Sequence, residues 1–98
     1  MFEIKLGEQG EVAMSGRLDA AQCERALAFM DGVAAPRVVD LGGLEYISSA
    51  GLGVLLKTQK RAMAAGQGLR LVNVNRHIRD IFKFAGFDRL FEIVPAAE

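Results

Sequence analysis

The stretch from Val38 to Gly53 decides the fold, and it reads VVDLGGLEYISSAGLG. It starts as a short, apolar and β-branched segment, the composition of a buried strand. A glycine-containing turn follows, and an amphipathic helix then begins at two adjacent serines, Ser48 and Ser49. The start of a helix has unpaired backbone N–H groups and carries the positive end of the helix dipole. The junction therefore suits either a helix cap or a phosphate group, and the residues alone leave both interpretations open.

The segments on either side of this stretch alternate between strand and helix patterns. Residues 2–6 alternate apolar and polar side chains, the period of a half-buried strand, and Gly7–Gly10 is a hairpin turn that leads to a second strand. Strands are predicted at residues 2–6, 11–15, 38–41, 69–74 and 90–94. The last residues, Pro95–Glu98, are expected to form a frayed tail.

Three helices are predicted between the later strands. The first is expected to begin at Asp19, because the strand pattern breaks over Gly16–Asp19 and Gln22 completes a capping-box signature. The second begins near Ser49, and the third follows a cap at Asn75. Their apolar stripes comprise Cys23, Ala26, Leu27, Met30 and Val33, then Leu52, Leu55, Leu56 and Met63, and finally Ile78, Ile81, Phe82 and Ala85. The outer face of the second helix carries Lys57, Lys60 and Arg61.

The resulting order is β-β-α-β-α-β-α-β, in one α/β domain over residues 1–98. A hairpin followed by helical crossovers implies a mixed sheet, because each crossover favours parallel neighbours. We therefore expect a mixed four- to five-stranded β-sheet with three to four α-helices packed on it.

The composition excludes several classes of protein. About half of the residues are apolar (51%) and 24% are charged, the balance of a globular domain and not of a disordered segment. Twelve basic and twelve acidic residues cancel, which argues against a nucleic-acid partner. The N-terminus has no signal-peptide pattern, and no apolar run is long enough for membrane insertion. Cys23 is the only cysteine, so an intrachain disulfide is excluded and the cytoplasm is the expected location.

The serine pair also raises the question of enzymatic catalysis. A serine nucleophile needs a base within hydrogen-bond reach, and His77 is the only histidine. The Gly-x-Ser-x-Gly elbow is absent, since Ile47 and Ala50 flank the two serines. His77 is therefore predicted to be a surface residue, and the protein is predicted not to be an enzyme.

Motifs for cofactors and metals are also incomplete. Gly51-Leu52-Gly53 and Gly66-Gln67-Gly68 are short glycine pairs, and neither completes a dinucleotide-binding or Walker motif. Close helix–sheet packing explains the first pair, and helix termination explains the second. One histidine, one thiol and scattered carboxylates offer no metal-ligand spacing, so neither a cofactor nor a metal is predicted.

Three parts of the chain together resemble the STAS domain of bacterial anti-sigma factor antagonists. Asp40–Leu56 carries the pattern Asp-Leu-x-x-Leu-x-Tyr-Ile, followed by Ser-Ser-Ala-Gly-Leu and an apolar helix. Gly16–Asp19 matches the family's Gly-x-Leu/Ile-Asp element. Phe82–Phe91 resembles the C-terminal pattern, in which a helix ends at a glycine before a last strand. The resemblance spans almost the whole chain in the right order and spacing.

This resemblance implies a binding protein that is switched by phosphorylation. In the family, the unphosphorylated antagonist binds an anti-sigma factor, which is usually also a serine kinase, and thereby frees the sigma factor. The kinase phosphorylates one serine at the start of the second helix, and a partner phosphatase reverses the reaction. The alternative is a STAS subunit or scaffold of a transport or signalling complex, without serine switching.

The resemblance also implies which residue is modified. Aligned on Gly51, the modified position of the typical motif Asp-Ser-Ser/Thr-Gly-Leu falls on Ser49, with Ser48 as the alternative. Ser48 stands where the family usually has aspartate, and Ala50 stands where it has a second hydroxyl residue. The resemblance further implies a partner-binding surface that comprises Asp19, Ser48, Ser49, Ala50, Gly51 and Leu52.

Overall fold

The computed structural model describes residues 1–97, and it has the predicted order of strands and helices. The strands are β1 (Phe2–Leu6), β2 (Val12–Leu18), β3 (Val38–Ile47), β4 (Arg70–Val74) and β5 (Glu92–Pro95). The helices are the short 3-10 helix η1 (Ala20–Gln22), α1 (Cys23–Asp31), α2 (Ser49–Ala64) and α3 (Arg76–Phe84). The prediction of an α/β fold with a mixed sheet is confirmed.

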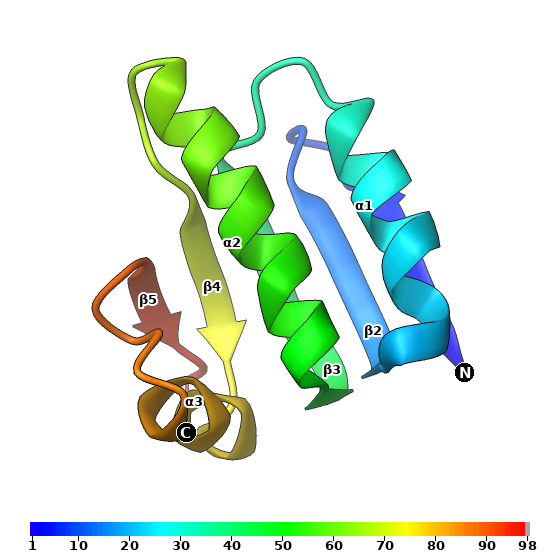
Figure 1. Ribbon diagram of the computed structural model, residues 1–98, viewed down its shortest axis with the longest axis vertical. Helices are drawn as coiled ribbons and strands as arrows, with labels where there is room; N and C mark the ends of the chain where they lie inside the picture. Colours follow the sequence, from blue (N-terminus) through cyan, green and yellow to red (C-terminus); the bar gives the residue numbers. More distant parts are fainter. Residues whose placement is uncertain (98) are drawn as a thin grey trace.

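The five strands form one sheet in the order β1-β2-β3-β4-β5. β1 and β2 are antiparallel, and every later pair is parallel, because a helix connects each successive strand to the next. Figure 1 shows α1 and α2 side by side across one face of the sheet, and α3 beside the lower ends of β4 and α2. The carboxyl ends of β2, β3 and β4 therefore share one edge, and this edge carries the serine pair.

β2 continues to Leu18, so the predicted end of this strand at Ser15 is wrong. Gly16 maintains the pairing by adopting a φ of 83°, which is strained for any other residue type. A Cβ at Gly16 would lie 2.1 Å from the backbone oxygen of Met1, and the next residue, Arg17, donates its N–H to that oxygen at 2.8 Å. Gly16 was predicted to break the strand pattern, but it instead allows Met1 to pack against the backbone of β2.

The first helix also differs from the prediction. Asp19 precedes η1, and its side chain makes no capping hydrogen bond, so the capping box of Asp19 and Gln22 is not formed. α1 itself begins at Cys23, also without a side-chain cap. The backbone N–H of Gln22 donates to the carbonyl of Asp19 at 3.1 Å, which closes a tight 3-10 turn, so the N–H that a capping-box carboxylate would bind is already bonded.

The core lies between the sheet and the helices. α3 buries Ile78 and Phe82, and the Phe82 ring lies 6.1 Å from the ring of Phe91. Two predicted core residues are exposed instead: Met63, in the last turn of α2, and Ala85, just beyond the end of α3. In the last turn of α2 it is Ala62, and not Met63, that faces the core, and Ala85 lies one residue beyond the end of α3.

The C-terminal segment is more ordered than predicted. Pro95 belongs to β5 and pairs with Val74, and the N–H of Ala96 donates to the carbonyl of Val74 at 3.1 Å. The expected frayed tail is therefore wrong for Pro95 and Ala96, and Glu98 lies outside the described residues.

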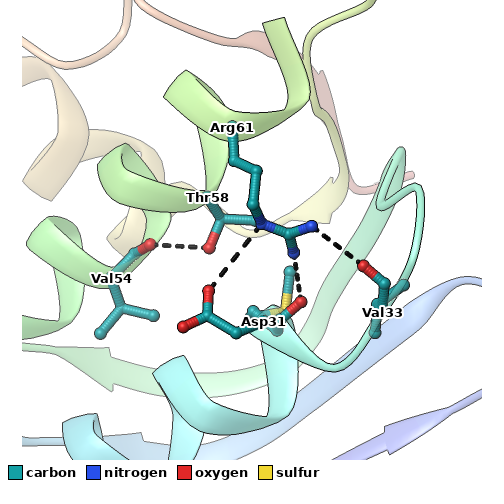
Figure 2. Close-up of polar contacts among 6 residues, drawn as sticks. Asp31, Val33, Val54, Thr58 and Arg61 are labelled. Atoms are coloured by element: carbon teal, nitrogen blue, oxygen red, sulfur yellow. Dashed lines mark hydrogen bonds and ion pairs between the residues drawn. The ribbon is translucent and has the colours of Figure 1, made fainter. Parts of the chain in front are cut away.

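Arg61 ties α2 to the end of α1, although it was predicted to lie on the outer face. Its guanidinium donates to the carbonyl of Met30 and, at 3.1 Å, to the carbonyl of Val33 (Figure 2). Its Nε lies 3.8 Å from Oδ1 of Asp31. Met30 lies in the last turn of α1 and Val33 lies just beyond it, so the guanidinium adds a charged donor at the negative end of the α1 dipole.

Arg61→Ala is expected to lower the free energy of unfolding by about 2 kcal/mol, because two carbonyl hydrogen bonds to a charged donor are lost. The measurement is urea denaturation followed by circular dichroism. Lys60→Ala is the matched control, since Lys60 is exposed on the same turn of α2 and should change stability by less than about 0.5 kcal/mol. Equal free energies of unfolding for the two variants would show that the Arg61 hydrogen bonds to the end of α1 do not stabilise the domain.

Candidate functional site

The serine pair lies where two parallel strands end side by side. Leu18, the last residue of β2, pairs with Ile47, the last residue of β3. The N–H of Ser48 then donates to the carbonyl of Leu18 at 2.9 Å, which continues the ladder for one more bond. The start of α2 is thereby held against the end of β2. In open α/β sheets, the carboxyl edge of the strands is the usual place for binding sites.

The two serines have different roles in this geometry. Ser48 is the N-cap of α2: its backbone is extended, and its Oγ accepts the N–H of Gly51 at 3.1 Å. Ser49 is the first residue of the helix and is exposed, and its hydroxyl makes no hydrogen bond within residues 1–97. One hydroxyl therefore serves the fold, while the other faces solvent.

Small residues bring the helix start close to the sheet. Gly51 is buried, and a Cβ there would lie 2.8 Å from Cγ1 of Ile47 and 3.0 Å from the backbone oxygen of Leu18. Leu52 is also buried, with 5% of its surface exposed, whereas Ala50 faces solvent. Gly51 and Leu52 thus hold the site in place, and Ser49 and Ala50 form its accessible surface.

Asp19 lies beside this loop, directly after the last residue of β2. The adjoining η1 packs against α2, which places the Asp19 segment at the same edge as the serines. Oδ1 of Asp19 is buried and has no hydrogen-bond partner among residues 1–97. Its backbone carbonyl accepts the thiol of Cys23 at 3.1 Å. The Asp19 carboxylate therefore lies beside the serine loop and takes no part in capping the following helix.

An open groove of about 420 Å³ lies on the other side of Ser49. Ser49 itself lines it, together with Tyr46 from β3. α3 contributes Ile81 and Phe84, and Phe84 is 92% exposed. The accessible serine is therefore flanked by an apolar surface.

His77 takes no part in this site. It is exposed at the second position of α3 and makes no hydrogen bond to Ser48 or Ser49. A nucleophile needs its base within hydrogen-bond reach, and no such pair is formed. No group of three or more His, Cys, Asp or Glu side chains in residues 1–97 is arranged to hold a metal ion.

A family model described as "Mlab, STAS domain" matches residues 2–95, which is nearly the whole chain. The chain belongs to the STAS domain family. The resemblance inferred from the sequence motifs is confirmed at the level of the family.

Relatives of this STAS domain include proteins named as anti-sigma factor antagonists. BtrV of Bordetella bronchiseptica is 38% identical over 81 residues, which cover 82% of this chain and 70% of BtrV. The anti-sigma factor antagonist SpoIIAA in its unphosphorylated form has a TM-score of 0.75 at 21% identity, over 100% of this chain and 90% of SpoIIAA. The phosphorylated form of Bacillus SpoIIAA has a TM-score of 0.69 at 21% identity, over 100% of this chain and 93% of that chain. The two SpoIIAA structures share the fold of this chain.

Sequence patterns missed part of the surface around the STAS serine loop. Asp19 and the serine pair were singled out and do lie at one edge, but Tyr46, Ile81 and Phe84 were not recognised as their neighbours. One signal was available: Phe84 is a large apolar residue outside the apolar stripe of its helix.

In residues 1–97, no helix has the length and apolar character needed to span a membrane.

Proposed function

We propose that this STAS domain is an anti-sigma factor antagonist that is switched by phosphorylation of Ser49. In its unphosphorylated form it binds an anti-sigma factor that is also a serine kinase, and phosphorylation releases it. A serine phosphatase restores the binding form, and the setting is the cytoplasm. The observation that carries the proposal is the exposed hydroxyl of Ser49, which lies at the first position of α2 and makes no hydrogen bond within residues 1–97.

The contrast between the two serines supports Ser49 as the acceptor. The oxygen of Ser48 accepts the Gly51 N–H, and the Ser48 side chain is half-buried. Modification of Ser48 would crowd a phosphoryl group into this cap. Ser49 projects into solvent with Ala50 as its small neighbour, so a kinase active site has room to close around its hydroxyl.

The position of Ser49 favours a fold that survives phosphorylation. A phosphoryl group adds roughly −1.5 to −2 charges, and the amino end of a helix is the part of a fold that best accommodates such an anion. SpoIIAA has been solved both without and with phosphorylation, and both forms have this fold. The switch is therefore expected to act on the interface and to leave the folded domain intact.

Release would follow from the cost of desolvation. A partner that packs over Ser49 must strip water from whatever that residue carries, which is cheap for a hydroxyl and expensive for a dianion.

The chemistry of the switch would belong to the partner. Phosphoryl transfer requires ATP, Mg²⁺ and a base that orients the hydroxyl. This chain contributes only the acceptor, and its own histidine lies outside the site. We therefore propose a binding protein and not an enzyme.

Ser49→Ala is expected to abolish phosphorylation and to retain binding, because it removes the acceptor oxygen and leaves the Ser48 cap intact. The protein is incubated with purified anti-sigma serine kinases from the same genome, ATP and Mg²⁺, and its intact mass is measured. The wild type should gain one phosphoryl group, and Ser49→Ala none. Ser49→Asp should weaken binding at unchanged helix content in circular dichroism.

Ser48→Ala is the matched control. It should still be phosphorylated, while the loss of the cap lowers the free energy of unfolding by about 1 kcal/mol. Phosphorylation of Ser49→Ala together with an unmodified Ser48→Ala would assign the site to Ser48. A wild type that no kinase of the genome modifies would favour a STAS subunit or scaffold of a transport or signalling complex.

A further inference from the structure

Phe84 is the most exposed aromatic side chain among residues 1–97. It is the last residue of α3, and 92% of its surface faces solvent. The neighbouring Phe82, on the inner face of the same helix, is fully buried. Large aromatic rings contribute strongly to interfaces when they are covered, so an exposed ring beside Ser49 is a candidate contact for a partner protein.

The Phe84 ring forms one wall of the groove beside Ser49, which we name the Phe84 groove. Ile81 and Ala85 line it from α3 and the residue that follows α3, and Tyr46 and Leu52 line it from β3 and α2. Figure 1 shows why these segments meet: α3 lies beside the first turn of α2, at the carboxyl edge of the sheet. The groove is open and about 420 Å³ in volume, enough for one or two large side chains.

We propose that the Phe84 groove receives an apolar side chain of the same anti-sigma kinase that receives Ser49. This inference rests on the proposed function and specifies where the partner docks. Ser49 lines the groove, so a kinase active site that surrounds this serine also covers the groove. Specific interfaces bury about 800 Å² on each partner, far more than Ser49 and Ala50 offer by themselves.

The chemistry around the groove defines its occupant. None of the lining residues is charged, which excludes an ionic ligand as the main contact. At one edge, the Arg17 guanidinium lies 4.5 Å from the centre of the Tyr46 ring and has no ion pair within residues 1–97. The arrangement matches a partner segment with an apolar side chain for the groove and a carboxylate for Arg17.

This geometry also explains how one phosphoryl group releases the partner. Ser49 stands at the rim of the groove, so its phosphate would lie against the apolar side chain that fills it. The dianion would lose its water on that side without gaining a donor. Phosphorylation at this position therefore removes the apolar contact without any change in the shape of the domain.

Titration calorimetry tests the proposal with the purified anti-sigma serine kinase that binds the wild type, in the presence of Mg-ADP. Phe84→Ala should raise Kd at least about tenfold, the range of aromatic residues at the centre of an interface. Met63→Ala is the control, because Met63 is 61% exposed near the other end of α2 and should leave Kd within about twofold. The melting temperatures of both variants should stay at the wild-type value.

Arg17→Gln provides a second measurement. Raising the salt concentration should weaken wild-type binding through loss of the Arg17 contact, and Arg17→Gln should show a smaller salt dependence. Hydrogen exchange in the complex should become slower over residues 81–85 and remain unchanged over residues 61–65.

Three results would separate the possible failures. If the wild type binds the kinase and is phosphorylated, and Phe84→Ala binds with the same Kd, the proposed docking site is wrong and the proposed function is unaffected. A wild type that neither binds an anti-sigma kinase nor is modified by one overturns the proposed function itself. Self-association of the wild type in sedimentation, lost in Phe84→Ala, means that a second copy fills the groove and that the proposal is wrong.

Discussion

Gly51→Ala is expected to lower the free energy of unfolding by about 2–3 kcal/mol, the cost of forcing a methyl group into a filled core site. The new Cβ would lie 2.8 Å from Cγ1 of Ile47 and 3.0 Å from the Leu18 carbonyl oxygen. That carbonyl cannot move aside, because it accepts the Ser48 N–H at 2.9 Å. The helix start must therefore shift away from β2, and Ser49 shifts with it. Chemical denaturation measures the loss of stability. Slower phosphorylation of the folded variant by the kinase would report the displacement of Ser49.

Gly53→Ala is the control for this prediction. Gly53 lies in the same helix, and nothing is within 4 Å of the position that its Cβ would occupy. Alanine has the higher helix propensity, so this variant should be as stable as the wild type or up to about 1 kcal/mol more stable. A Gly51→Ala variant that matches Gly53→Ala would contradict close docking of α2 on β2.

Gln59→Leu is expected to lower the free energy of unfolding by about 2–4 kcal/mol, since two backbone groups lose their partner, one of them buried and the other partly buried. Gln59 is 6% exposed, and its Oε1 accepts the Leu69 N–H at 2.6 Å. Its Nε2 donates to the Leu90 carbonyl at 2.5 Å. One side chain of α2 thereby joins the segment before β4 to the segment before β5. Thermal unfolding should show a decrease in Tm of roughly 10 °C or more.

Thr58→Val is the control for Gln59→Leu. Thr58 is equally buried, but its hydroxyl donates only to the Val54 carbonyl of its own helix, at 2.9 Å (Figure 2). Valine has nearly the same shape, so the change should cost no more than about 1 kcal/mol. Similar losses of stability in the two variants would show that the hydrogen bonds of Gln59 to Leu69 and Leu90 do not stabilise the domain.

Local patterns predicted most of the fold because they depend on neighbours along the chain. Apolar periodicity placed every strand and helix in the right order, and the cap at Asn75 is confirmed by its acceptance of the Ile78 N–H at 2.9 Å. Two of the failures share one cause. Gly16 and Asp19 carry local turn signals, and contacts with Met1 and within η1 override those signals.

The candidate site shows the same division between what local patterns predict and what tertiary contacts decide. The sequence alone determined that two serines lie at a strand–helix junction, and its motifs identified the STAS family. Only the tertiary structure decided that Ser48 supplies the cap, that Ser49 remains free, and that Phe84 stands beside it. The physical reason is that periodicity and capping act between residues within a few positions of one another. The environment of Ser49 instead depends on β2, β3 and α3, which meet only after the sheet has formed.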